Sequence, residues 1–121
     1  MATLTAKLTL TSSDTGTSAL DATTTSALAV TLPSADINRQ SIATGSAQDI
    51  IATNSAFSYI YLKNVSGTGS NPWVQIKLGG DAKIKLRVGE FVFLPLYSSQ
   101  VVSGEAQVGA CTVEYGYWSV S

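Results

Sequence analysis

The side chains that could do chemistry in this 121-residue chain are few, and their types exclude most catalytic arrangements. The sequence contains no His and a single Cys, Cys111. Ser-His and Cys-His nucleophile pairs therefore cannot form, and neither can a zinc site of the usual nitrogen and sulfur ligands. The missing imidazole is also the side chain that most often serves as a general base near neutral pH. We therefore expect a protein that is not an enzyme and has no catalytic residues.

The carboxylates are spread along the chain without a spacing that favours any cluster. A glycosidase needs two carboxylates at a defined separation, and a calcium site needs several oxygen ligands together. Acidic residues in loops more often form turns and helix or strand caps. We expect no cofactor and no metal ligand from the following residues: Asp14, Asp21, Asp36, Asp49, Asp81, Glu90, Glu105 and Glu114. Cys111 alternates with Val113 and Tyr115 on one strand face and has no basic neighbour in sequence, which predicts a small buried hydrophobe.

Basic residues gather in one predicted β-hairpin, formed by residues 73–78 and 82–88 around Gly79-Gly80-Asp81. Alternation places Ile76, Ile84 and Leu86 inward, and we also expect Ala82 and Val88 to point inward. Either register that keeps the apolar residues on one face puts Lys77 opposite another lysine, Lys83 or Lys85. These side chains either keep the strand soluble and block edge pairing or dock onto an acidic neighbour. The candidate docking residues are Lys77, Lys83, Lys85 and Arg87.

The segment 91–96 is apolar on both of its faces, whereas a strand of a two-layer sandwich normally has one face in water. The C-terminal strand adds aromatic side chains of a type enriched at interfaces. Core packing and an oligomer interface are both open as explanations. The candidate interface residues are Phe91, Phe93, Leu94, Tyr117 and Trp118.

The elements that must position these residues are strands. Period-two alternation is clearest over residues 3–11, where Leu and Ala alternate with Thr and Lys. Further strands are predicted at 28–32, 49–52, 57–64, 73–78, 82–88, 91–96 and 107–118, with one short pairing around Ile42 in an otherwise irregular segment. About eight short strands at turn spacing predict an all-β antiparallel sandwich of jelly-roll or Greek-key type. We expect a single domain over residues 1–121, with residues 1–20 as an N-terminal strand or arm.

Net charge and the length of the apolar stretches limit the classes of partner that we expect. The net charge of −1 gives no field to attract nucleic acid, and no apolar stretch has the length of a membrane helix. The N-terminal residues lack the pattern of a signal peptide, and one Cys cannot form an internal disulfide. We expect neither nucleic acid nor membrane as a partner, and synthesis in a bacterial cytoplasm.

Three segments of the C-terminal half carry a resemblance to a known group of proteins. They are Tyr59-Ile60-Tyr61-Leu62-Lys63-Asn64, then Gly89-Glu90-Phe91-Val92-Phe93-Leu94-Pro95, and finally Val113-Glu114-Tyr115-Gly116-Tyr117. The chain resembles small β-sandwich structural proteins of tailed bacteriophages, of the capsid decoration or cement type. The resemblance covers roughly the last sixty residues, and the family element before Gly-Glu-Phe has Pro where this chain has Val88.

The resemblance implies a virion component without giving its position in the particle. Our leading hypothesis is a protein on the exterior of the capsid, whose partner is the major capsid protein. We expect it to cement the shell as a homo-oligomer, with a trimer suggested by the threefold positions of a capsid lattice. The alternative is a small tail, neck or head-fibre component that binds host-surface glycan. Trp73, near the Gly69-Ser70-Asn71 loop, is its candidate sugar contact.

Overall fold

The computed structural model describes residues 2–12, 20–31, 37–51, 58–66, 72–96 and 101–120. One end residue of each of the predicted strands 28–32, 49–52 and 57–64, and the Gly69-Ser70-Asn71 loop, lie outside the described residues. Contacts divide the chain into two compact units, residues 1–31 with 120–121 and residues 32–119. The first unit contains β1 (Ala2–Ser12) and β2 (Leu20–Thr31), which form an antiparallel hairpin in which Leu4 lies opposite Leu28. The N-terminal element is thus a hairpin longer than the predicted segment 1–20.

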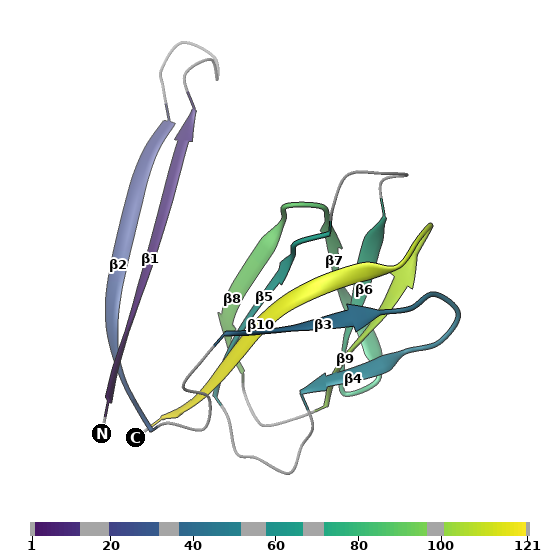
Figure 1. Ribbon diagram of the computed structural model, residues 1–121. Coiled ribbons are helices and arrows are strands. Elements are labelled where there is room, and N and C mark those ends of the chain that lie inside the picture. Colours follow the sequence, from purple (N-terminus) through teal and green to yellow (C-terminus); the bar gives the residue numbers. More distant parts are fainter. Residues whose placement is uncertain are drawn as a thin grey trace. The chain divides into compact units, whose positions relative to one another are not determined.

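The second unit is an antiparallel β-sandwich of eight strands (Figure 1). One sheet has the order β3-β10-β5-β8, and the other has the order β4-β9-β6-β7. The strands are β3 (Asn38–Ile42), β4 (Gln48–Ile51), β5 (Tyr59–Asn64), β6 (Trp73–Leu78), β7 (Asp81–Arg87), β8 (Phe91–Pro95), β9 (Val102–Gln107) and β10 (Cys111–Val120). We call the first of these sheets the β10 sheet and the second the β9 sheet.

The strand order is that of a jelly roll. The first strand of the sandwich pairs with its last, β3 with β10, and the next pairs follow inward as β4 with β9, β5 with β8 and β6 with β7. The pairs β5–β10 and β6–β9 then join these ribbons into two sheets. This nesting is what a long hairpin produces when it rolls into two Greek keys. The predicted fold class is confirmed, and the described residues form ten strands in all.

The core lies between the two sheets. Strands β5 and β6 contribute alternate residues, as the burial pattern of β5 shows with Ile60, Leu62 and Asn64 inward. Ile76 and Leu86 are buried, and Ile84 is partly buried against the same cluster, as their alternation with lysines predicts. The buried cluster consists of Ile42, Ile50, Ile51, Ile60, Leu62, Val74, Ile76, Leu86, Val102, Ala106, Cys111 and Val113.

The register of the β6–β7 hairpin differs from both predicted alternatives. Gly79 and Gly80 have φ values of 64° and 94° and form a two-residue turn of the kind that matches strand twist. The register shifts at Ile76/Lys77, so Lys77 lies opposite Ala82 and Lys83 is the extra residue of a bulge. The prediction that Lys77 faces another lysine is therefore wrong. The bulge places Ala82 opposite Lys77, and this pairing avoids the repulsion between like charges on facing strands.

Two positions of this hairpin are exposed for different reasons. Ala82 lies between the turn and the bulge, where the alternation is offset by one residue, and it is exposed. Val88 follows the last residue of β7 and is 40% exposed. Both were expected to point inward.

Candidate functional site

The four basic residues of the β6–β7 hairpin lie on the outer face of the β9 sheet, and most of them have partners within the chain. Lys77 Nζ lies 3.5 Å from Glu105 Oε1 on the neighbouring strand β9, and Arg87 Nη1 lies 3.5 Å from Glu90 Oε1. Lys85 Nζ lies 4.2 Å from the centre of the Trp73 ring. Lys83 is exposed at the bulge. The structure therefore brings the predicted docking residues to one face, but with two of their charges offset by carboxylates.

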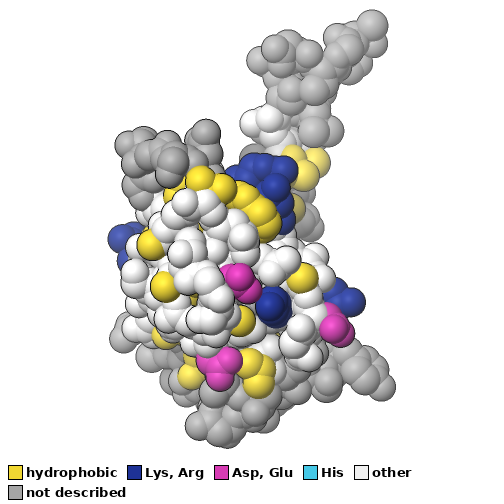
Figure 2. Space-filling view, turned by 90° about the vertical axis from the view of Figure 1, so that its right-hand side faces the viewer, with side chains coloured by type: hydrophobic (Ala, Val, Ile, Leu, Met, Phe, Trp, Pro, Cys, Tyr) yellow, Lys and Arg dark blue, Asp and Glu magenta, His cyan; other side chains and the backbone are white. Residues whose placement is uncertain are grey.

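Figure 2 shows one face of the molecule, on which Lys and Arg side chains lie in separate groups with Asp or Glu beside some of them. Lys85 covers one face of the Trp73 ring, and the Gly69-Ser70-Asn71 loop lies outside the described residues. A sugar could stack on Trp73 only by displacing this cation from that face, or by using the other one.

Aromatic side chains collect on the outer face of the β10 sheet. Phe93 of β8 stacks with Tyr59 of β5 at 5.9 Å between ring centres, and it lies 6.4 Å from the Trp118 ring of β10. Phe91 on the same face is 55% exposed. Gly116 makes room for this group, because a Cβ there would lie 2.9 Å from Trp118 and Ile37 side-chain atoms. The face therefore carries a band of aromatic residues across three neighbouring strands.

The predicted interface residues divide between this face and the core. Phe91, Phe93 and Trp118 belong to the outer face of the β10 sheet. Leu94 and Tyr117 point the other way and pack against the protein's own buried cluster. The segment 91–96 is thus apolar on both faces for two reasons, since its inward residues fill the core and its outward ones join the aromatic band.

A polar network lies beside the aromatic band. Tyr61 Oη donates to Glu114 Oε1 over 2.8 Å, and Arg39 donates to Glu114 Oε2 from Nη2 at 3.2 Å. Burial, followed by the bond to Glu114, raises the pKa of Tyr61 to about 12. The Tyr61 hydrogen bond, aided by Arg39, lowers the pKa of Glu114. Near neutral pH the network therefore joins a carboxylate, a guanidinium and a neutral phenol across β10, β3 and β5.

Asn64 links the two sheets where β5 ends, and it is fully buried. Its Nδ2 donates to the carbonyl oxygen of Leu86 in the β9 sheet over 3.1 Å, and its Oδ1 accepts from Ser66 N over 3.1 Å. Ser66 Oγ also bonds to Oδ1 and accepts from Thr112 N over 3.0 Å. The backbone of Asn64 bonds to Gly89 and Glu90 in the β7–β8 turn. The Asn64 side chain therefore links β5 directly to β7 and, through the Ser66 hydroxyl, to β10.

These contacts assign structural roles to the segments that carry the phage resemblance. Asn64 ends the first segment, Glu90 caps the turn of the second by accepting from Arg87 N over 2.6 Å, and Gly89 has a φ of 85°. Glu114 and Gly116 of the third segment hold the polar network and the aromatic band. Sequence reasoning did not single out Tyr61, Asn64 or Glu114 as contact residues, although all three lie in the quoted segments.

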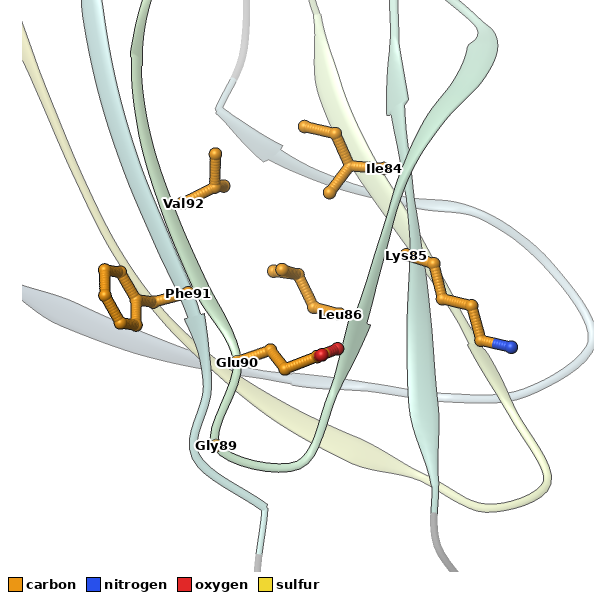
Figure 3. Close-up of a pocket in the computed structure, with 7 residues that line it drawn as sticks. All are labelled: Ile84, Lys85, Leu86, Gly89, Glu90, Phe91 and Val92. Atoms are coloured by element: carbon orange, nitrogen blue, oxygen red, sulfur yellow. The ribbon is translucent and has the colours of Figure 1, made fainter. Parts of the chain in front are cut away.

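A shallow groove opens between the edge strands β7 and β8 (Figure 3). Its volume is about 480 Å³. Ile84, Leu86 and Val92 point into it, whereas Lys85 and Phe91 point away from it (Figure 3). The Glu90 carboxylate lies at the end near the turn. The groove is thus an apolar opening at the edge of the sandwich where the core meets the surface.

Within the parts of the chain that the structure describes, no three His, Cys, Asp or Glu side chains lie close enough to hold a metal ion. Among the same residues no helix is long and apolar enough to cross a membrane. Comparisons with protein-family models, with curated proteins and with solved structures give no significant match.

Proposed function

We propose that this protein is a structural component of a tailed-phage particle that decorates the capsid exterior and cements the shell by binding the major capsid protein. The observation that carries the proposal is the structural role of the three segments in which the chain resembles phage structural proteins. Their polar residues Asn64, Glu90 and Glu114 make contacts that hold a jelly roll together, which is the fold that the resemblance implies. Jelly rolls recur in viral capsid proteins and in lectins, which supports the proposal without defining it.

The mechanism of a cement protein needs no catalysis. A protein that binds only the assembled shell stabilises that state by mass action, and many copies on a symmetric lattice add contacts that one copy cannot supply. We propose that the protein acts without turnover as a closed homo-oligomer, with a trimer matching the threefold positions of a shell. The exposed Phe91 and the aromatic band on the β10 sheet offer apolar surface for contacts between copies.

The second candidate function is a host-glycan adhesion module in a tail, neck or head fibre. The aromatic band beside the Arg39–Glu114 pair favours it, because sugar sites combine aromatic surface with charged hydrogen-bonding groups. Cement and adhesion differ in position on the particle, on the shell in the first case and on an appendage in the second.

Removing the basic face should weaken docking onto the shell. If Lys77, Lys83, Lys85 and Arg87 meet an acidic capsid surface, replacing all four by Gln slows association and removes most of its salt dependence, because exposed charges act over about 8–10 Å near physiological salt. The measurement is the binding rate of purified protein to particles of the encoding phage that lack it, at several salt concentrations.

Two matched single variants control for net charge. Lys83→Gln removes one exposed charge from the β9 sheet, and Lys63→Gln removes one partly exposed charge from the β10 sheet. Only the first should slow association. Unchanged binding of the fourfold variant, with its fold intact by circular dichroism, would show that these side chains only solvate the sheet.

A further inference from the structure

Strand β8 ends the β10 sheet, and among the residues that the structure describes it pairs only with β5. Edge strands usually carry charged residues or bulges, or are very short, and these features prevent a further strand from adding to them. The edge strand β7 has lysines and a bulge, β4 has four residues and a register shift, and β3 carries Arg39. The sequence of β8 has no charge, and its register with β5 is continuous. Only Pro95, at its end, cannot donate a hydrogen bond to an added strand.

The hydrogen bonds to β5 determine which backbone groups of β8 face the open edge. Asn64 N at the end of β5 donates to Glu90 O, directly before β8 begins. Successive residues of an edge strand alternate between bonding to the neighbouring strand and facing away from it. The even-numbered residues of β8 therefore bond to β5, whereas the N–H and C=O groups of Phe91 and Phe93 point toward the open edge.

The groove between β7 and β8 lies beside this edge. Ile84 and Leu86 of β7 and Val92 of β8 point into it (Figure 3). A strand added to β8 would extend the β10 sheet, and its residue opposite Val92 would point to the same side as Val92, into the groove. An apolar side chain suits this position, because a charge there would lose hydration without gaining a partner.

The size of the open edge favours an extended segment over a second folded copy as the occupant. Strand β8 is about 17 Å long, and the two layers with their outer side chains are about 20 Å thick. Two copies that meet edge to edge would therefore bury about 700 Å² in total, below the ~1,200–2,000 Å² of a stable interface between folded proteins. An extended segment needs less area, because main-chain hydrogen bonds supply much of its affinity.

We propose that β8 binds an extended segment of a partner protein as an added antiparallel strand. The segment exchanges backbone hydrogen bonds with Phe91 and Phe93, and its alternate residues are apolar and enter the β7–β8 groove. This inference goes beyond the proposed cement function and does not depend on it, because any partner with such a segment would fit.

Amide hydrogen exchange of the dilute full-length protein tests whether the edge is open. The amides of Phe91 and Phe93 should exchange at least about 100-fold faster than those of Val92 and Leu94, which bond to β5. Equally slow exchange of all four amides would show that the edge is already covered and would overturn the proposal.

The probe for the added strand is a synthetic peptide with capped ends, Glu-Thr-Val-Thr-Leu-Thr-Glu. It should slow the exchange of the Phe91 and Phe93 amides. Two N-methylated forms of this peptide are the matched controls. Methyl groups on the Val and Leu nitrogens point away from β8 and should leave binding intact, whereas methyl groups on the last two Thr nitrogens should weaken it at least about 10-fold, because they remove hydrogen bonds to the edge.

A protein variant tests the groove. Ile84→Asn should weaken binding of the unmodified peptide at least about 10-fold, because it places a polar group where the apolar side chain docks. Ser41→Asn, on the exposed side of β3, is the matched control and should have no effect. Equal binding of the two N-methylated peptides, or no binding of the unmodified peptide at millimolar concentration, would refute the added strand. A dimer of the wild-type protein that protects the same amides would show that a second copy is the occupant instead.

Discussion

Replacing Asn64 by Ala is expected to destabilise the protein by about 3 kcal/mol or more, a large share of the ~5–15 kcal/mol that stabilises a typical domain. The side chain is fully buried and donates to Leu86 O while accepting from Ser66. Its removal leaves a carbonyl oxygen and a backbone amide without their partner, and each buried unsatisfied group costs about 1–3 kcal/mol. The measurement is the free energy of unfolding from chemical denaturation.

The contacts of Asn64 also predict a graded series. Ser66→Ala removes only the hydroxyl that bridges Asn64 and Thr112 N, so it should cost about 1 kcal/mol. Ser41→Ala, on the exposed side of the edge strand β3, should change the stability by less than about 0.5 kcal/mol. A loss below that same limit for Asn64→Ala would show that the two sheets do not depend on this side chain.

Leu86→Ala is expected to cost about 2–5 kcal/mol, because it removes a side chain that is 3% exposed and leaves a cavity beside Ile76 and Val92. The adjacent Lys85→Ala is the matched control. Lys85 points to the outer face and contributes mainly its contact with Trp73, worth about 0.5–1 kcal/mol at an exposed site.

Thermal and denaturant unfolding of both variants would measure this contrast. Equal losses for Leu86→Ala and Lys85→Ala would mean that the hairpin faces the other way.

The sandwich could be predicted because its hydrophobic periodicity is strong in β6 and β7, where apolar residues alternate with polar ones. Strand β9 escaped prediction, because its buried positions are occupied by small residues such as Ser103 and Gly104. Side chains of the flanking strands β4 and β6 occupy the space over Gly104, where a Cβ would lie 3.1 Å from Ile50 and Val74 side-chain atoms. Small residues at these buried positions give no hydrophobic signal, so the alternation does not mark this central strand.

The residues of the candidate docking face could be predicted from the sequence, but the groups that they contact could not. The alternation predicts four basic residues on one sheet face, yet Glu105, the partner of Lys77, lies on β9, which only the strand order brings beside β6. A single bulge at Lys83 changed the pairing of the hairpin, and nothing in the alternation marks where a bulge falls. The contact of Asn64 could not be predicted from alternation either, since its hydrogen bond to Leu86 joins residues of different sheets.

A cement role on the capsid shell is tested most directly by a reconstruction of the encoding phage's particle. We expect density for the jelly roll at every equivalent position of the shell, with closed oligomers bound to the major capsid protein and Phe91 covered by a neighbouring copy. Density confined to the tail, neck or fibres would contradict the cement role and favour the adhesion module. Isolated monomers on the shell, with Phe91 in contact only with their own chain, would contradict the oligomer.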